Sequence, residues 1–545
     1  MCFYTKFPGS CSCKVFECRI IRISAHDTAV RGHIFHFMDA DHQTLTIKQV
    51  AEAIGAELTA AGDGSLASDA ALDVTHDSRQ AREGTLFVAI KGATVDGHRF
   101  IDDVIRRGSA GVISEFDAPE GFRSAWLKVA DARVALAKAA SIVNGEPSHH
   151  LDLIGITGTN GKTTTTYLCY ALAEAAGIKP AMLTTVEYRV GEESEAAVRT
   201  TPEASDTNRF LRRAVEANCG FAAMEASSQA IDLHRCDWLR FRVAVFTNLT
   251  QDHLDYHGTM ENYFLAKRKL FDGSLGEKPG ASAINIDDEW GKRLAAELRA
   301  NGDRVVTFAQ TSPADLTAGD ISVSLIKGTR FMLRTPAGDR EVISPLVGKP
   351  HVYNMLSATA VALELGYDLD SIVRGLASCT GAPGRFERVP HDGDFAVVVD
   401  YAHTDDALLN TLRTARDLTE GRVLTVFGCG GDRDRTKRAP MGRIAGEFSD
   451  LSFITSDNPR TEDPLKIIGE IEVGMKNTGA DFHSVSDRRD AIYRAIAAAR
   501  PGDVVIIAGK GHENYQIIGN DKFHFDDREV ALDAIEAAKE KQGGR

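Results

Sequence analysis

Residues 151–177 read LDLIGITGTNGKTTTTYLCYALAEAAG, and this stretch decides the fold of the middle of the chain. LDLIGIT is an apolar run typical of a buried strand, GTNGK is a glycine-rich turn, and the remaining residues predict a helix. A strand that enters a helix through such a turn is the repeating unit of a parallel α/β sheet. We therefore expect an open parallel sheet that binds its ligands at the carboxyl ends of its strands.

The glycine-rich turn predicts a phosphate-binding loop. Glycines let backbone N–H groups point at a phosphate, the helix N-terminus adds positive potential, Lys162 adds a full charge, and the Thr163 hydroxyl can ligate Mg²⁺. The spacing G-x-x-G-K-T differs from the G-x-x-x-x-G-K-[ST] of ordinary P-loops. Without a ligand, we expect the Lys162 ammonium to be hydrated. The residues assigned to this loop are Gly158, Thr159, Asn160, Gly161, Lys162, Thr163 and Thr164.

The alternation of strand and helix extends along most of the chain. Further central strands are expected within 221–227, 242–248 and 281–287, and a helix toward the end of 345–366. On the N-terminal side, Thr46 predicts the cap of a helix over 47–58, and TLFVAI (85–90) and AGVISE (110–115) read as strands. On the C-terminal side, strands are expected within 395–403, 422–431, 451–460 and 503–513. The expected class is α/β with three domains, 45–148, 149–382 and 383–545.

Composition excludes several classes of protein. Lys and Arg number 63 against 77 Asp and Glu, a net charge of −14, which argues against a nucleic-acid partner. No apolar run of 18 residues exists, so we expect no membrane span. Residues 1–44 are Cys-rich and lack periodicity, and we expect them to be an N-terminal extension, disordered or preceding a true start at Met38. The cysteines show no C-x-x-C pair, which favours free thiols in a reducing compartment.

Two polar segments follow the central strands. Glu225 comes at the end of FAAMEAS, where a carboxylate can hold Mg²⁺; the neighbouring Ser227 and Ser228 could equally be helix caps. His253 and His257 have the i, i+4 spacing of a helical Zn²⁺ pair, but the HExxH pattern is absent and oxygen donors dominate nearby. We therefore expect His253 near Mg²⁺ and solvent-side capping roles for the rest of this segment.

Four charged or glycine-rich segments follow the C-terminal strands, at 400–403, 428–435, 457–460 and 509–513. Together they predict a sheet edge that carries both signs of charge. Such an edge suits an amino-acid-like zwitterion, because Arg pairs with carboxylates while Asp and Glu pair with ammonium groups. The alternative for each segment is an ordinary solvated loop.

The motifs GTNGKTT, NLTQDHLDYH, GRFE, VVDYAHT, FGCGGDRD, DNPRTEDP and AGKGHENYQ occur in this order. In these motifs, and over about residues 45–535, the chain resembles the Mur ligase family. The resemblance implies a UDP-binding N-terminal domain, a central P-loop-type ATPase domain and a Rossmann-like C-terminal domain that presents an amino acid. It implies a cytoplasmic, monomeric enzyme of peptidoglycan synthesis. With ATP and Mg²⁺, the enzyme would add meso-2,6-diaminopimelate to UDP-N-acetylmuramoyl-L-alanyl-D-glutamate through an acyl phosphate.

The resemblance also implies roles for individual residues. Lys162, Lys267 and His253 would be catalytic, and Asn354 would join the glycine-rich loop in binding ATP. Lys267 would carry a CO₂-derived carbamate. Mg²⁺ would be held by Thr163, Glu225, His253 and the carbamylated Lys267. The UDP-muropeptide would contact the loop 93–95, Ser78, Thr200, Thr201, Ser227 and Arg235. Diaminopimelate would contact Arg433, Asp457, Asn458, Pro459, Arg460, Gly509 and Glu513.

Three residues depart from the family pattern. Leu233 stands where relatives often have Gln, Arg199 replaces an Asn before the Thr200–Thr201 pair, and His351 replaces an Asn three residues before Asn354. The first two bear on the muropeptide contacts and the third on the adenine contacts.

Several alternatives to these interpretations stay open. The chain could be a lysine-adding ligase of the same family, a ligase like folylpolyglutamate synthetase, or a non-catalytic P-loop regulator. The 45–148 block and the DNPR loop argue against the folylpolyglutamate alternative. Lys267 could also be an ordinary surface lysine of a helix.

Overall fold

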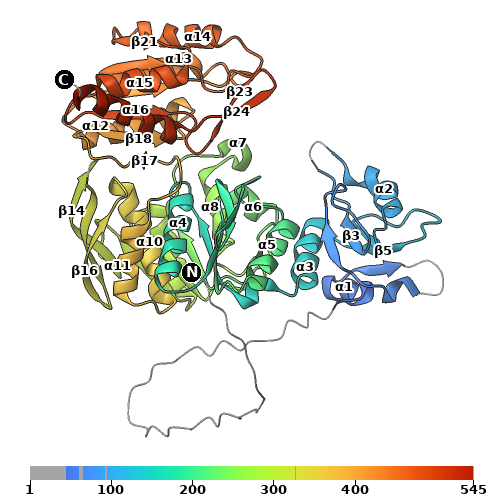
Figure 1. The fold of residues 1–545 in the computed structure, drawn as a ribbon. Coiled ribbons are helices and arrows are strands. Elements are labelled where there is room, and N and C mark those ends of the chain that lie inside the picture. Colours follow the sequence, from blue (N-terminus) through green and yellow to red (C-terminus); the bar gives the residue numbers. More distant parts are fainter. Residues whose placement is uncertain (1–43, 60–64, 93–94, 326, 544–545) are drawn as a thin grey trace, which may run out of the picture. The chain divides into compact units, whose positions relative to one another are not determined.

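Three β-sheets flanked by helices follow one another along the chain (Figure 1). The structure, a computed structural model, describes residues 44–59, 65–92, 95–325 and 327–543. The expected extension 1–44, except Thr44, and residues 93 and 94 of the expected UDP loop therefore lie outside the described residues. Each sheet falls inside one of the three expected ranges, and the exact domain boundaries stay predictions.

The first sheet has the order β1-β5-β4-β3-β2, with β1 antiparallel to β5 and the other pairs parallel. Its elements are α1 (Ile47–Ile54), β1 (Glu57–Thr59), β2 (Asp73–Thr75), β3 (Thr85–Val88), α2 (Ile101–Arg106), β4 (Gly111–Ser114), β5 (Ala125–Lys128) and α3 (Ala132–Val143). Short 3₁₀ helices cover Ser65–Ser68, Gly97–Phe100 and Pro147–His150.

The expected N-terminal helix is confirmed at its start and corrected at its end. Thr46 caps α1 through a reciprocal pair of hydrogen bonds with Gln49. The helix stops at Ile54 because Gly55 takes a left-handed backbone (φ 71°), and Glu57–Thr59 forms strand β1 instead of continuing the helix.

The central sheet has 11 strands in the order β16-β15-β14-β13-β12-β11-β6-β10-β7-β8-β9. Strands β14 to β7 of this order pair in parallel, whereas β15, β16, β8 and β9 are added as antiparallel hairpins. The strands are β6 (Asp152–Thr157), β7 (Pro180–Leu183), β8 (Glu187–Val190), β9 (Glu193–Ala196), β10 (Phe221–Glu225), β11 (Val243–Phe246), β12 (Ala281–Asn285), β13 (Val305–Ala309), β14 (Leu316–Ser324), β15 (Gly328–Thr335) and β16 (Gly338–Ser344).

Helices cover both faces of the central sheet. They are α4 (Lys162–Ala175), α5 (Ala204–Glu216), α6 (Ser228–Asp232), α7 (Leu254–His257), α8 (Met260–Arg268), α9 (Glu289–Ala300), α10 (Lys349–Glu364) and α11 (Leu369–Ser378). Ile154 of β6 lies in a core with α4, α10 and α11, while its neighbour Leu153 lies in a second core with α5, α8 and α9. This alternation places β6 in the middle of the layers, as expected for a strand buried on both faces.

The third sheet has the order β17-β18-β22-β19-β20-β21, and only β17 is antiparallel. Its strands are β17 (Glu387–Arg388), β18 (Ala396–Asp400), β19 (Val423–Phe427), β20 (Leu451–Ile454), β21 (Phe482–Ser484) and β22 (Val504–Ala508). A hairpin of β23 (Tyr515–Ile518) and β24 (Asp521–His524) follows. Helices α12 (Asp405–Leu418), α13 (Arg438–Phe448) and α14 (Pro464–Lys476) cover one face, and α15 (Arg488–Ala498) and α16 (Asp527–Gly543) cover the other.

No helix in the described part of the chain combines the length and apolar character that a membrane crossing requires.

A fully buried ion pair joins α15 to α16. Arg488 donates from Nε to Asp527 Oδ1 at 2.8 Å and from Nη2 to Oδ2 at 2.7 Å, and neither side chain is exposed to solvent. The same Nη2 donates to the carbonyl of Ala508 at the end of β22. The pair thus links two helices to the strand that leads into the expected amino-acid site.

We predict that Arg488→Leu lowers the free energy of unfolding by about 3–5 kcal/mol, because it leaves the Asp527 carboxylate buried without its partner. Arg489→Leu is the matched control. It breaks the exposed Arg489–Asp533 pair between the same two helices and should cost at most about 1 kcal/mol. Chemical denaturation followed by circular dichroism measures both. Equal losses for the two variants would contradict the special cost of the buried pair.

Candidate functional site

The glycine-rich loop connects β6 to α4 in a space too small for side chains at two positions. A Cβ on Gly158 (φ 146°) would lie 1.9 Å from Thr247 Oγ1, and a Cβ on Gly161 (φ 88°) would lie 2.4 Å from Asn354 Oδ1. Gly161 is also the residue that precedes the first turn of α4. Both glycines are therefore required by close approach and by backbone conformation.

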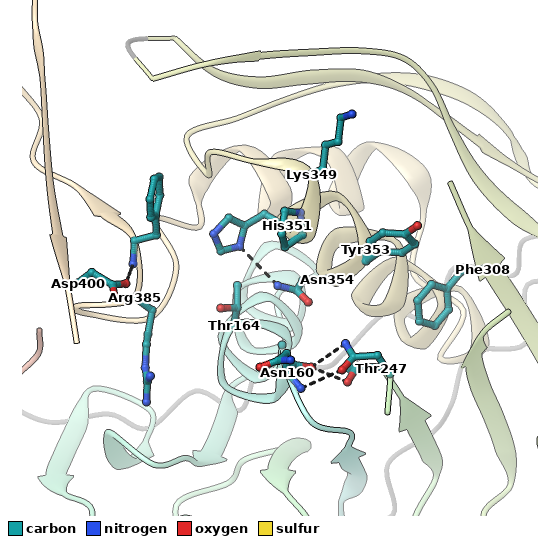
Figure 2. Close-up of a pocket in the computed structure, with 14 residues that line it drawn as sticks. Asn160, Thr164, Thr247, Phe308, Lys349, His351, Tyr353, Asn354, Arg385 and Asp400 are labelled. Atoms are coloured by element: carbon teal, nitrogen blue, oxygen red, sulfur yellow. Dashed lines mark hydrogen bonds between the residues drawn. The ribbon is translucent and has the colours of Figure 1, made fainter. Parts of the chain in front are cut away.

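Side chains after β11 hold the loop in shape. Asn160 N donates to Asn248 Oδ1 at 3.0 Å, and Thr247 Oγ1 donates to the carbonyl of Asn160 at 2.6 Å (Figure 2). Thr159 Oγ1 donates to the carbonyl of Thr250 at 3.2 Å. These bonds fix the shape of the loop, and Thr163 is half-buried as the second residue of α4.

Lys162 does not extend into solvent. Its ammonium donates to the carbonyls of Gly158 (3.0 Å) and Thr159 (2.9 Å), and burial lowers its pKa. The expectation of a hydrated ammonium is wrong, because the loop curls around the side chain that follows it. Glu225 and Asp252 lie near enough to oppose this lowering electrostatically.

Lys267 is buried beside the same loop. The side chain, on α8, is 1% exposed, and its Nζ donates to the carbonyl of Gly158 at 2.9 Å and lies 3.5 Å from Thr157 Oγ1. Burial, and next the charge of Lys162, lower the pKa of Lys267 well below its usual range. The alternative of an ordinary surface lysine is therefore wrong. A neutral amine at this position is favoured over an ammonium.

Glu225 ends β10 with its side chain 1% exposed. Its carboxylate accepts hydrogen bonds from Thr185 N at 2.8 Å and Thr185 Oγ1 at 3.2 Å. Within the described residues, no group of three or more His, Cys, Asp or Glu side chains gathers as a candidate metal site. Glu225 and Asp252 lie near Lys162, and together with Thr163 they offer oxygen donors from three different segments.

The two histidines after β11 differ in their surroundings. His253 is half exposed and precedes α7 with a left-handed backbone (φ 51°). His257 is only 7% exposed, its Nε2 lies 2.9 Å from Ser228 Oγ, and its ring stacks on Tyr263. The expected solvent-side role for His257 is therefore wrong, and burial lowers the pKa of this imidazole.

Most of the expected muropeptide residues lie together at the carboxyl end of β10. Thr201 Oγ1 donates to the Glu225 carbonyl at 2.7 Å and accepts from Ser227 N at 3.1 Å, and Arg235 Nη1 donates to the Thr201 carbonyl at 3.3 Å. Thr200 contacts Thr185. Ser227 also caps α6, so the capping alternative is confirmed for this residue.

Arg199, one of the three departures, joins the same group. Its Nη1 lies 3.1 Å from Glu203 Oε1, and Arg235 Nη2 lies 2.8 Å from the same oxygen. The departure therefore adds a second guanidinium to a carboxylate that Arg235 already uses. Of the other two departures, Leu233 directly follows α6, and His351 lies in the pocket described below.

Ser78 lies in the loop after β2. The loop is fastened to α5 by Arg209, which donates to Asp73 Oδ1 (3.0 Å), Gln80 Oε1 (2.9 Å) and the Val74 carbonyl (2.9 Å). Sequence reasoning missed Arg209. Its position on an amphipathic helix is typical of a solvated side chain, so the sequence contains no signal for it.

The expected diaminopimelate residues do lie together at one edge of the third sheet. Asn458 Nδ2 donates to Glu513 Oε2 at 2.8 Å, and a Cβ on Gly509 would lie 2.7 Å from Asp457 Oδ2. Arg460 has a left-handed backbone (φ 50°) and donates to the Gly431 carbonyl at 2.8 Å. A Cβ on Gly430 would lie 3.0 Å from Arg460 Nη1 and 3.7 Å from Arg433 Cγ, which places the two arginines on the same side.

Lys510 belongs to this edge although we did not assign it. The side chain is fully buried, and its ammonium donates to Asn458 Oδ1 at 3.3 Å and lies 3.4 Å from Glu513 Oε2. The position of Lys510 between two glycines, directly after an apolar strand, could have indicated from the sequence that it belongs to the site. The edge therefore holds three cations and two carboxylates. Asp457, Asn458 and Lys510 are buried, which argues against the solvated-loop alternative for the segments 457–460 and 509–513, whereas residues 432–435 are exposed.

A cavity of about 380 Å³ lies between the glycine-rich loop, the start of α10 and the segment that leads into the third sheet (Figure 2). Asn354 contributes its amide, whose Nδ2 lies 3.5 Å from His351 Nδ1, and burial lowers the pKa of His351 to about 4. Arg385 and Asp400 line the opposite wall. Both belong to motifs quoted above, GRFE and VVDYAHT, but we did not assign them to the site.

These features define a three-sheet α/β protein with a P-loop-type nucleotide site on its central sheet and a mixed-charge site on its third. Three family models match the chain in succession: "Mur ligase family, catalytic domain" over residues 73–158, "Mur ligase middle domain" over 156–362, and "Mur ligase, glutamate ligase domain" over 384–511.

Known proteins agree with these matches. The UDP-N-acetylmuramoyl-L-alanyl-D-glutamate–2,6-diaminopimelate ligase of Geobacter metallireducens is 46% identical over 489 residues, covering 86% of this chain and 94% of that protein. The ligase of the same name from Solibacter usitatus is 46% identical over 470 residues, with the same coverage. A solved structure of a ligase of this name is 31% identical, with a TM-score of 0.69 over 91% of this chain and 99% of that chain. The chain belongs to the Mur ligase family.

We predict that Lys267→Met raises the free energy of unfolding at neutral pH in CO₂-depleted buffer. The folded protein favours a neutral Lys267, whereas the unfolded chain carries an ammonium at that pH, so the unfolded state binds more protons. The free energy of unfolding of the native protein should therefore rise as the pH increases from about 7 toward 10, and the methionine variant should lose that component.

Lys269→Met is the control. Lys269 is partly exposed and pairs with Asp232 at 2.8 Å, so its replacement should leave the pH dependence intact. Urea denaturation across this pH range measures the free energy of unfolding of the native protein and of the two variants. An unchanged pH dependence in Lys267→Met would show that Lys267 is protonated in the folded state.

Proposed function

We propose that this protein is an ATP-dependent ligase that joins meso-2,6-diaminopimelate to UDP-N-acetylmuramoyl-L-alanyl-D-glutamate in the synthesis of peptidoglycan precursors. The observation that carries the proposal is the mixed-charge edge of the third sheet, where Arg433 and Arg460 lie beside Asp457 and Glu513. Diaminopimelate has a carboxylate and an amine at each end, and this edge offers partners of both signs. The 46% identity to ligases of that name supports the same substrate.

The first step activates a carboxylate. A carboxylate is a poor electrophile, since an oxide would have to leave. An oxygen of the D-glutamate side-chain carboxylate attacks the γ-phosphorus of ATP. The bond between this phosphorus and the bridging oxygen of the β-phosphate breaks, ADP departs, and the substrate carboxylate becomes an acyl phosphate. Backbone N–H groups of the 158–164 loop would hold the phosphates, and Lys162 would exchange its two carbonyl partners for phosphate oxygens.

The second step forms the amide. The neutral amine of diaminopimelate attacks the acyl carbon, a tetrahedral intermediate forms, and phosphate departs while the nitrogen loses a proton. The cluster of Thr200, Thr201, Ser227 and Arg235 would hold the peptide end of the muropeptide, and the loop with Ser78 would hold its UDP end. Water exclusion matters here, because hydrolysis of the acyl phosphate would waste ATP.

The residues around the loop suit Mg²⁺. Glu225, Asp252 and Thr163 supply hard oxygen donors, the ligands that this ion prefers. The ligands that the family resemblance implies also include His253 and a carbamylated Lys267. When bound, Mg²⁺ would neutralise charge on the phosphates.

We infer that Lys267 takes up CO₂. Its neutral amine can attack the carbon of CO₂ and release a proton, which converts a buried base into a carbamate anion. Burial and the nearby charge of Lys162 both favour the neutral amine, and the product would add oxygen donors to the loop.

From the family resemblance we also propose that the protein works as a monomer in the cytoplasm, with no nucleic-acid or membrane partner. The net charge of −14 supports the absence of a nucleic-acid partner.

The experiment that tests the function measures phosphate release with ATP, UDP-muropeptide and either diaminopimelate or lysine. We predict release with diaminopimelate, and Arg460→Ala should raise its KM by about tenfold to a hundredfold, the loss of one charged hydrogen-bonding partner. The KM for ATP should stay near its native value. Arg443→Ala, which removes an exposed pair with Glu447 on α13, is the control. Equal use of lysine by the native protein would contradict the substrate assignment, and ATP binding without release would indicate a regulator.

We predict that Lys267→Ala is nearly inactive and that a short carboxylate such as formate partly restores its activity by entering the vacated space. Lys269→Ala should stay active, because that side chain is partly exposed and pairs with Asp232. Carbamate formation can be followed directly by ¹³C NMR of the native protein in ¹³C-bicarbonate. A fully active Lys267→Ala variant in CO₂-depleted buffer would sink this proposal.

A further inference from the structure

A fully buried arginine lies beneath the mixed-charge edge and has no part in the proposed function so far. Arg438, the first residue of α13, is 0% exposed. Its Nη1 donates to Glu462 Oε2 at 3.0 Å and Glu470 Oε2 at 2.8 Å, and its Nη2 donates to Glu462 Oε1 at 2.8 Å and the Gly430 carbonyl at 3.3 Å. The guanidinium therefore bridges two carboxylates and one loop backbone.

Glu462 connects Arg438 to the loop 428–435. Its Oε1 accepts a hydrogen bond from Asp432 N at 2.6 Å, and the Asp432 carboxylate accepts in return from Thr461 N at 3.1 Å and Thr461 Oγ1 at 2.8 Å. Asp432 has a left-handed backbone (φ 54°), a conformation that these bonds hold in place. Glu462 thus fixes the residue directly before Arg433.

The loop 428–435 and the loop 457–463 also interlock through their backbones. Gly431 N donates to the Asn458 carbonyl at 2.9 Å, and Arg460 Nη1 donates to the Gly431 carbonyl at 2.8 Å. A Cβ on Gly431 would lie 1.9 Å from the Pro459 carbonyl oxygen, so the two loops are in direct contact. The spacing between Arg433 and Arg460, one on each loop, depends on this contact and on the support beneath it.

Charge compensation is the second consequence of Arg438. The side-chain bonds from Arg438, and next the bond from Asp432 N, lower the pKa of Glu462 to about 2, so this carboxylate is ionised at neutral pH. Without the guanidinium, the Glu462 carboxylate would lose its main partner and keep only its hydrogen bond from Asp432 N, so the residue directly before Arg433 would be held less firmly.

We propose that Arg438 and Glu462 are positioning residues that set the spacing of Arg433 and Arg460 for the far carboxylate of diaminopimelate. They thereby determine the preference for diaminopimelate over lysine. This inference rests on the proposed function of the same site. Neither residue touches the substrate; each acts through the loop that carries an arginine.

Arg438→Lys and Glu462→Gln test the proposal in the full-length protein. The lysine keeps the charge but loses the fork that reaches two carboxylates and a carbonyl, and the glutamine keeps the shape but loses the charge. Glu470→Gln is the matched control. Glu470, on α14, pairs with the same guanidinium and with the exposed Arg435 side chain, but it bonds to no loop backbone. The KM for each of the three substrates, and the ratio of kcat/KM for diaminopimelate over lysine, are measured for every variant.

We expect Arg438→Lys and Glu462→Gln to raise the KM for diaminopimelate by about tenfold and to lower the diaminopimelate-to-lysine ratio, with little change in the KM for ATP or the muropeptide. Glu470→Gln should leave all three KM values within about twofold of native. A role confined to stability would lower kcat or the melting temperature and leave the KM for diaminopimelate and the ratio unchanged, and that result would overturn the inference.

The activity of the native protein distinguishes failure of the proposed function from failure of the inference. If the native protein releases no phosphate with diaminopimelate, the proposed function fails and the inference fails with it. If the native protein prefers diaminopimelate and both variants keep that preference, only the inference fails.

Discussion

The close packing of the loop 158–161 against its neighbours is the constraint on which the nucleotide site depends. The space at Gly158 is closed by Thr247, which directly follows β11, and the space at Gly161 by Asn354 of α10, far away in the sequence. The shape of the loop therefore depends on the pairing of β6 with β11 and on the packing of α10 against α4, and the bonds of Asn160 to Asn248 and Thr247 add to that support.

Much of the fold could be predicted because each buried strand and its flanking helix are encoded locally. The strands around 152–157, 221–225 and 504–508 and the capping role of Thr46 follow from apolar runs and short-range hydrogen bonds. The hairpins that extend the central sheet, such as β15 with β16, could not be found the same way. Their half-buried residues alternate only weakly, and their pairing depends on a neighbouring strand placed by the rest of the sheet.

The candidate site was predictable to the extent that its residues sit in glycine-rich or charged segments directly after strands. The environment of each side chain was not. His257 and Lys162 are polar residues in loop-like sequence, yet one is stacked beneath Tyr263 and the other is turned back onto its own loop. Arg209 and Arg438 lie on helices, where an arginine is usually solvated, and only the packing of distant segments gives them their partners.

The two sites handle buried charge in opposite ways, and the difference fits their chemistry. Lys267 and Lys162 both donate to the carbonyl of Gly158, and burial, followed by the like charge of Lys162, favours loss of a proton from Lys267. A neutral amine is a nucleophile, and a modified one would supply new oxygen donors. Beneath the third sheet, Arg438 lies between two carboxylates and keeps its charge because every partner compensates it. A compensated ion pair is unreactive but directional, and it can hold two loops at a fixed separation. Uncompensated charge at the nucleotide loop thus favours chemical change, whereas compensated charge at the amino-acid edge favours a fixed geometry.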